Sequence, residues 1–117
     1  MRGTELAERS DAPAALRRFK DSLLGPDSVS ELKRGLIGAE MMISGPYGLK
    51  PFLYADYVAS GRALRQVEDF VARDVLPFYA NVHSAASYCG SYMTHLREAA
   101  RAEIGRLVGA GGDCAVI

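Results

Sequence analysis

The stretch "THLREAARAEIGRLVGAGG", residues 94–112, carries the clearest secondary-structure signal in the chain. Its apolar residues recur every three or four positions, which places them on one face of an amphipathic helix. These residues are Leu96, Ala100, Ile104 and Leu107. The glycines that begin at Gly109 are a typical C-terminal stop. The stretch therefore predicts a helix over residues 94–108.

Two segments further from this helix show the same periodicity. In "RALRQVEDFVARDVLPFY", the apolar stripe predicts a helix over residues 62–76 that ends at Pro77. In "PAALRRFKDSLLG", residues 13–25, one apolar face again predicts a helix. Most of the chain that carries a clear pattern is therefore helical.

A fourth helix is predicted from its first turn. In "DSVSELKRGLIG", residues 27–38, Ser28 stands three residues before Glu31. This spacing is typical of a capping box, in which the two side chains satisfy backbone donors at the helix start. We therefore expect a helix that begins at Ser28.

Strand signals are few. The aromatic and β-branched residues of "FLYADYVA" predict an extended segment over residues 52–57, and "CAVI", residues 114–117, predicts the start of a buried strand. The glycines and prolines of "MMISGPYGLKP" predict a loop over residues 41–51, and a second loop is expected over residues 77–90. The expected fold class is α+β, mostly helical with one or two short strands. A buried strand at "CAVI" needs neighbours, so either the segment folds back as a tail or the molecule continues beyond it, and we expect continuation.

Composition narrows the class of protein. The 117 residues fit one ordinary domain, and 14 basic residues balance 14 acidic ones. This balance gives no electrostatic reason to expect nucleic acid or an anionic membrane as partner. The N-terminus lacks an apolar signal core, so we expect a cytoplasmic protein with Cys89 and Cys114 as free thiols. No two cysteines or histidines lie at metal-ligand spacing.

Three segments in order carry a resemblance. They are "KPFLYADYVASGRAL", "VEDFVARDVLPFYANVHS" and "LREAARAEIGRLVGAGGDCAVI", within residues 50–117. This ordered set resembles the N-terminal part of class V aminotransferases, the pyridoxal-phosphate (PLP) enzymes that include cysteine desulfurases. Val58 stands where a threonine is expected in the most similar branch of that class.

The resemblance implies a fold type I enzyme, usually a homodimer, that acts on a small amino-acid-type substrate with PLP as cofactor. Residues 1–12 would be a flexible N-terminus, and residues 13–117 the N-terminal portion of the enzyme domain without its catalytic part. Lys20, Lys33 and Lys50 match no Schiff-base position of the family. We therefore expect no cofactor binding and no activity for this chain alone.

The candidate site lies in two polar segments. The resemblance implies that Ala59 and Ser60 line the substrate pocket, where small residues allow a ligand to approach the backbone. Asn81 and His83 form the second part, because a loop imidazole can donate to a substrate carboxylate or relay a proton. A plain solvent-exposed histidine remains the alternative for His83.

Two further alternatives stay open. Asp56 can cap a local turn or pair with Arg62. His95 has a structural or an exposed role at the start of its helix. The chain as a whole is either the enzyme segment described above or a small helical partner-binding protein with only ancestral likeness to the enzymes.

Overall fold

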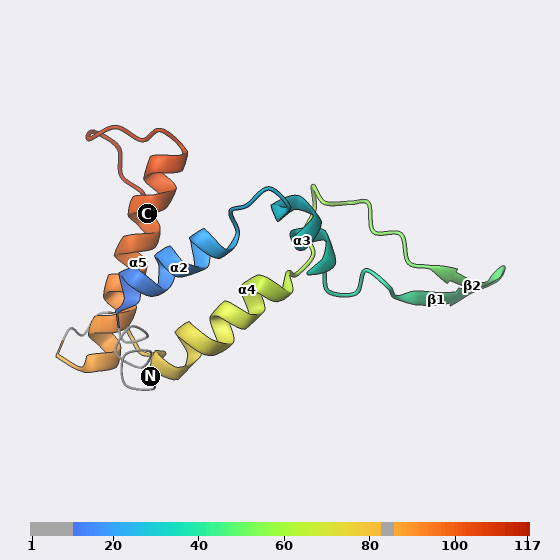
Figure 1. Ribbon diagram of the computed structural model, residues 1–117, viewed down its shortest axis with the longest axis horizontal. Helices are drawn as coiled ribbons and strands as arrows, with labels where there is room; N and C mark the ends of the chain where they lie inside the picture. The colour runs from blue at the N-terminus through green and yellow to red at the C-terminus, as the bar shows by residue number, and fades with distance from the viewer. Residues whose placement is uncertain (1–10, 83–85) are drawn as a thin grey trace. The chain divides into compact units, whose positions relative to one another are not determined.

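A computed structural model describes residues 11–82 and 86–117, which contain four α-helices and one two-stranded sheet (Figure 1). This confirms the α+β, mostly helical class. The chain divides into two compact units. We call Met1–Leu24 together with Phe70–Ile117 the helical unit, and Gly25–Asp69 the hairpin unit. The prediction of a flexible N-terminus covers residues 1–12, and residues 1–10 lie outside the described residues.

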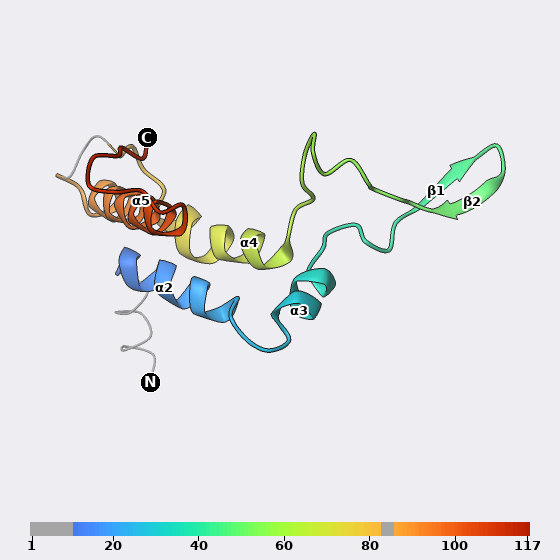
Figure 2. The ribbon, with the colours of Figure 1, turned by 90° about the horizontal axis from the view of Figure 1, so that it is seen from above.

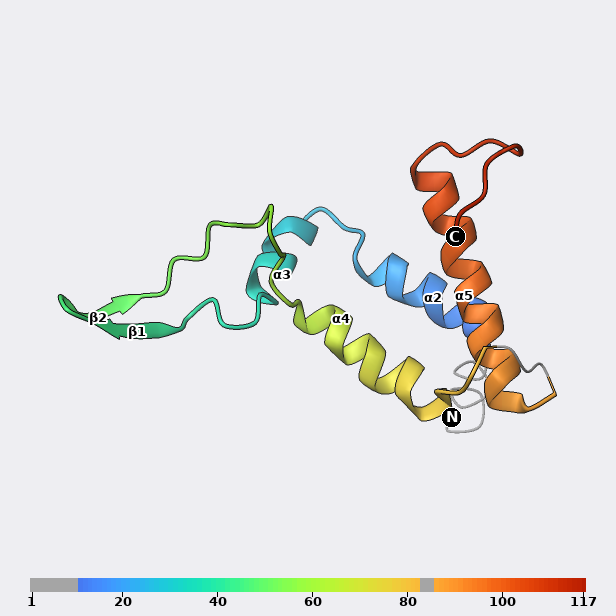
Figure 3. The same cartoon turned by 180° about the vertical axis from the view of Figure 1, so that it is seen from behind.

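Helices α2 (Ala12–Ser22) and α5 (Tyr88–Leu107) pack against each other in the helical unit (Figures 1 and 3). Helix α2 begins where the Asp11 carboxylate accepts a hydrogen bond from the Ala14 amide at 3.2 Å. Helix α5 begins six residues before the predicted start, because the Ser87 hydroxyl accepts from the Gly90 amide at 3.0 Å. The predicted loop over residues 77–90 is therefore wrong at its end.

A small apolar core joins these two helices. Ala12 and Ala15 of α2 are small enough to let α5 approach, and Tyr92 and Leu96 of α5 fill the contact. Phe70 completes the core and its ring stacks on Phe19 at 4.4 Å between centroids. Half-buried side chains surround this core: Leu16, Phe19, Val75, Phe78 and Met93. The apolar stripe that predicted α5 therefore meets its partner at Leu96.

The predicted helix over residues 62–76 is only partly correct. Helix α4 spans Arg65–Phe70, after which the backbone widens into one π-helical turn, Val71–Val75, and tightens into a 3₁₀ turn, Leu76–Phe78. The widening is marked by the Leu76 amide, which donates to the carbonyl five residues before it. Proline in the 3₁₀ turn then ends the helical segment, as the sequence predicts.

The end of α5 confirms the glycine stop. Gly109 has a positive φ of 67°, and the Ala110 amide donates to the Gly105 carbonyl at 2.9 Å. This six-to-one hydrogen bond defines a Schellman motif, which needs a left-handed residue just after the helix. The prediction of a strand at "CAVI" is wrong, because residues 114–117 follow a turn and have no strand geometry.

In the hairpin unit, helix α3 (Ser28–Arg34) forms as predicted, but the capping box does not. Asp27 occupies the cap position, which moves Ser28 into the first turn, and no side chain hydrogen-bonds the cap. Ser28, the expected capping partner of Glu31, therefore lies one residue after the cap position.

The predicted loop over residues 41–51 is instead a β-hairpin (Figure 2). Strands β1 (Met42–Gly45) and β2 (Gly48–Pro51) pair antiparallel through a two-residue turn. Gly48 takes a positive φ of 85°, so the glycines that indicated a loop serve the turn.

The predicted strand over residues 52–57 is wrong. After the Phe52 amide donates to the Met41 carbonyl, the chain leaves the ribbon and turns.

Candidate functional site

The segment Tyr54–Gly61 is closed into a local loop by its own side chains. The Tyr54 hydroxyl lies 2.6 Å from the Ser60 carbonyl, to which it donates, and 2.7 Å from the Ser60 hydroxyl. The Asp56 carboxylate accepts from the Ala59 amide at 3.4 Å. Asp56 therefore caps the turn, which is the first of its two predicted roles.

The Arg62 side chain is anchored at the base of this loop. Among the described residues, it forms no ion pair with Asp56. Its guanidinium donates to the Ile37 carbonyl at 2.8 Å and lies 5.5 Å from the ring centroids of both Phe52 and Tyr54. The group is thus held by one hydrogen bond and two cation–π contacts. Gly38 leaves the room for it, since a Cβ there would overlap the guanidinium.

Three further hydrogen bonds join the residues that follow the loop to α3 and to the turn after it, within the hairpin unit. The Ile37 amide donates to the Ala63 carbonyl at 3.0 Å, and the Arg65 amide donates to the Gly35 carbonyl at 2.8 Å. The Gln66 amide group donates to the Glu31 carbonyl at 2.8 Å. Hydrogen bonds from the backbone and from polar side chains therefore hold the loop, with very little apolar burial.

The predicted substrate-binding residues divide between the units. Ala59 and Ser60 lie together at the end of the closed loop in the hairpin unit, and both are exposed. Asn81 is exposed and belongs to the helical unit, while His83 lies outside the described residues. The structure thus brings together Ala59 and Ser60, and the pairing with Asn81 and His83 stays a prediction.

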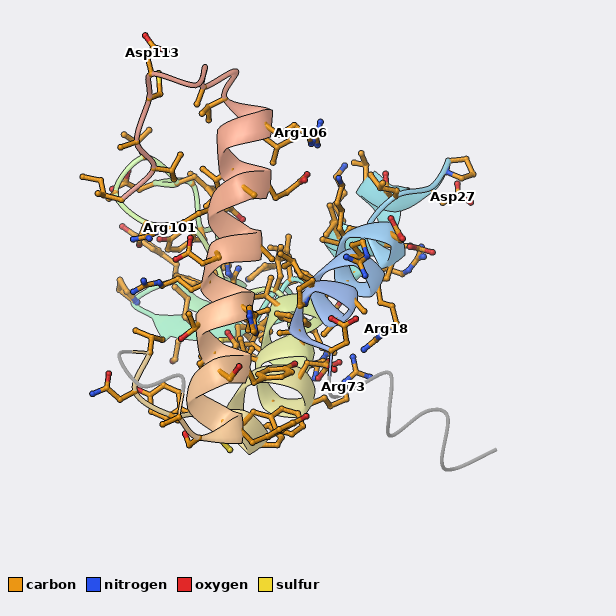
Figure 4. The ribbon with its side chains drawn as sticks, turned by 90° about the vertical axis from the view of Figure 1, so that its left-hand side faces the viewer. Arg18, Asp27, Arg73, Arg101, Arg106 and Asp113 are labelled. Carbon is orange, nitrogen blue, oxygen red and sulfur yellow. The ribbon has the colours of Figure 1, made fainter. Side chains whose placement is uncertain are left out.

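Sequence reasoning missed a charged groove between α2 and α5. The groove has a volume of about 390 Å³, with Leu16 and Ala102 among its apolar lining residues. Glu103 at its edge receives hydrogen bonds from Arg106 of the same helix, at 2.6 Å, and lies 2.7 Å from the Lys20 ammonium of α2. Figure 4 shows Arg106 near the C-terminal end of α5.

These two cations change the acidity of the carboxyl group between them. Hydrogen bonds from Arg106 and then from Lys20 lower the pKa of Glu103 from 4.5 to about 2. The same pairing raises the pKa of Arg106 above its ordinary value. The three-residue spacing of Glu103 and Arg106 was visible in the sequence, but the partner on α2 required the packing of two helices.

A second groove, of about 270 Å³, lies at the start of both helices and contains His95. The Ser91 hydroxyl is 3.4 Å from the Nδ1 atom of His95, one turn later on α5. Asp11 also lines the groove, but its carboxylate already caps α2. His95 is exposed and lies in the second turn of α5, which confirms one of its two predicted roles.

Tyr92 reaches from this region into the core. Tyr92 is 3 % exposed, and its hydroxyl donates to the Asp74 carbonyl at 2.8 Å. Burial raises the pKa of Tyr92 above its ordinary value, and the nearby Asp74 carboxylate acts in the same direction. The tyrosine is therefore a neutral donor that fastens the segment after Phe70 to α5.

The three lysines of the chain are either paired with a carboxylate or exposed. A Schiff-base lysine needs an unpaired amine beside an enclosed site. Lys20 is held by Glu103, and Lys33 and Lys50 project from exposed positions on α3 and β2. None of the three is therefore a free amine beside an enclosed site.

The described residues also contain no group of three or more potential metal ligands, and Cys89 and Cys114 are free thiols there.

Comparison with known protein families, with curated proteins and with solved structures gave no match for this chain. Among the described residues, no helix combines the length and the apolar composition needed to cross a membrane.

Proposed function

We propose that this chain forms the N-terminal segment of a PLP-dependent class V enzyme related to the aminotransferases and cysteine desulfurases. In this proposal the segment shapes the substrate entrance for a small amino-acid-type substrate of a homodimeric enzyme. The cofactor-binding lysine is assigned to another part of the enzyme, so the chain alone is inactive.

The closed loop over residues 54–61 is the observation that carries the proposal. Tyr54 and Asp56 use their polar atoms to fold the loop on itself, which leaves Ala59 and Ser60 exposed at its end. Small side chains at an exposed turn allow a ligand to contact the backbone closely. This is the arrangement that the resemblance implies for the substrate entrance.

The gene offers the first test of this proposal. We expect the reading frame to continue past codon 117 into a Gly/Ser/Thr-rich turn and later a lysine motif. A stop codon directly after codon 117 in independent isolates would contradict the proposal and favour the second candidate function.

The protein encoded by the whole gene offers the second test. Amino acids are titrated into this protein while the visible absorbance of the bound cofactor is recorded, which gives an apparent affinity for each amino acid. We expect Ser60→Val to weaken that affinity about tenfold, because the larger side chain would keep the ligand away from the loop backbone. The matched control is Ser30→Val on the exposed surface of α3, which should leave the affinity unchanged. Equal affinities for the two variants would count against the assigned entrance.

The second candidate is a small partner-binding protein, and the exposed apolar side chains favour it. Tyr47 and Leu53 of the hairpin unit are 87 % and 85 % exposed. Leu107 and Val108 at the end of α5 are also exposed. Large apolar side chains that are exposed in this way are available to a partner in each unit.

A further inference from the structure

The β-hairpin has no covering layer among the described residues. All eight residues of β1 and β2 are exposed, including Met42, Ile43 and Leu49. A two-stranded ribbon alone is only marginally stable in water, because each strand has an unpaired edge. The ribbon therefore gains stability from any strand that pairs with one of these edges.

The register defines which backbone groups face outward. The Phe52 amide donates to the Met41 carbonyl at 2.8 Å, so this pair is a hydrogen-bonded pair of the ribbon. Hydrogen-bonded and non-hydrogen-bonded pairs alternate along an antiparallel ladder. With Met42 opposite Pro51 and Ser44 opposite Leu49, both of these pairs direct their N–H and C=O groups to the outer edges.

The two outer edges differ in their capacity to pair. On β2, Pro51 has no N–H group, so this edge lacks one of its outward donors. Lys50 lies between Leu49 and Pro51, and pairing of this edge with its own copy would bring two ammonium groups face to face. On β1, Met42 and Ser44 keep both donors and both acceptors, and the strand carries no charge.

We propose that β1 pairs antiparallel with β1 of a second copy of this chain, centred on Ile43. In this register Met42 lies opposite Ser44 of the second copy, and the reverse pair completes the two-fold symmetry. Each pair exchanges two hydrogen bonds, which makes four in total. The two Ile43 side chains meet on the axis as a non-hydrogen-bonded pair, where β-branched contacts stabilise a sheet.

Charge also agrees with this register. Lys50 lies beside Ile43 in the ribbon, so the two Lys50 residues of the four-stranded sheet are three strand spacings apart. That distance is about 14 Å, since strands lie about 4.8 Å apart. Salt at physiological strength screens exposed charges beyond about 8 Å. The β1 edge therefore accepts a second copy without repulsion, whereas the β2 edge does not.

Engineered cysteines test the register in a background with Cys89→Ser and Cys114→Ser. The two copies of Ile43→Cys would have Cα atoms about 4.5 Å apart, which suits a disulfide, whereas Lys50→Cys would place them too far apart. We expect oxidised Ile43→Cys to run as a covalent dimer on a non-reducing gel and Lys50→Cys to remain monomeric. Equal cross-linking of both variants, or cross-linking of neither, would overturn the proposal.

Proline substitutions test the edge without breaking the ribbon. Ser44→Pro removes an outward N–H group that the ribbon itself does not use, and Leu49→Pro does the same on the other edge. Sedimentation equilibrium should show a dimer whose dissociation constant rises about tenfold or more in Ser44→Pro, because two hydrogen bonds are lost per dimer. Leu49→Pro should match the unmodified protein. An unmodified protein that is monomeric, or a dimer that Ser44→Pro does not weaken, would refute pairing through β1.

Discussion

Helices α2 and α5 of the helical unit share a buried apolar core, whereas the hairpin unit is held almost entirely by hydrogen bonds. All five buried apolar residues among the described ones belong to the helical unit: Ala12, Ala15, Phe70, Tyr92 and Leu96. In the hairpin unit, the described side chains that hold the loop at residues 54–61 act through polar atoms, as Arg62 and Gln66 do.

This difference affects both stability and sequence signal. Apolar burial contributes about 25 cal/mol per Å² and leaves a periodic pattern in the sequence. A hydrogen bond contributes only about 1 kcal/mol net and can come from the backbone of any residue. We therefore expect the helical unit to be sensitive to truncation of side chains, and the hairpin unit to be sensitive to changes of backbone and of single polar contacts.

The largest expected effect is that of Leu96→Ala in the core of the helical unit. Truncation of a nearly buried leucine should lower the free energy of unfolding by about 2–5 kcal/mol. The matched control is Leu53→Ala in the hairpin unit, which should change it by less than about 0.5 kcal/mol because Leu53 is exposed. Urea unfolding followed by far-ultraviolet circular dichroism measures both. Similar losses for the two variants would show that the units do not differ in this way.

A smaller effect is expected from Gly38→Ala in the hairpin unit. Gly38 has a positive φ of 79°, which costs an alanine about 1–2 kcal/mol, and the new Cβ would displace the Arg62 guanidinium. Gly48→Ala is the control, because its φ is also positive but no atom lies within 4 Å of the added Cβ. Amide hydrogen exchange at Ile37 and Arg65 should accelerate in Gly38→Ala more than in Gly48→Ala. Identical exchange in the two variants would remove Arg62 from its assigned role.

The same contrast explains which parts of the fold could be predicted. Helices α2 and α5 followed from apolar periodicity, because Leu16 and Phe19 of the predicted α2 face pack against the core and Leu96 of α5 is buried in it. The hairpin was missed because its strands bury nothing, so that only turn residues such as Gly48 marked it. The aromatic run after it was mistaken for a strand because Tyr54 uses its hydroxyl to close a loop.

The candidate site was predictable to the same extent. The turn at Asp56 follows from local chemistry, since a carboxylate commonly accepts from a backbone amide a few residues later. The anchor of Arg62 on Ile37 and the pairing of Lys20 with Glu103 join residues far apart in the chain. No local pattern specifies such contacts, and only the folded chain reveals them.

Tyr92→Phe should have an effect of about 1 kcal/mol on the helical unit. The substitution keeps the buried ring and removes only the hydroxyl that donates to the Asp74 carbonyl. Tyr79→Phe serves as the control, because Tyr79 is 73 % exposed. Thermal unfolding should place Tyr92→Phe below the unmodified protein and Tyr79→Phe level with it. A core that is equally stable without the Tyr92 hydroxyl would show that packing alone fastens this segment.

The smallest expected effect concerns pH and Glu103. Because the pKa of Glu103 is lowered from 4.5 to about 2 by Arg106 and Lys20, the folded state favours the charged carboxylate. The resulting stabilisation is therefore complete above pH 4.5 and disappears as the pH falls towards 2.

Glu103→Gln should unfold at a lower urea concentration than the unmodified protein at neutral pH, and the difference should vanish near pH 2. Since these side chains are partly open to solvent, the difference should be small and should shrink in high salt. Glu98→Gln is the control. Its two arginine partners both belong to α5, so the loss of these ion pairs breaks no contact between helices. A difference for Glu103→Gln that persists unchanged at low pH would mean that its side chain acts through packing and not through charge.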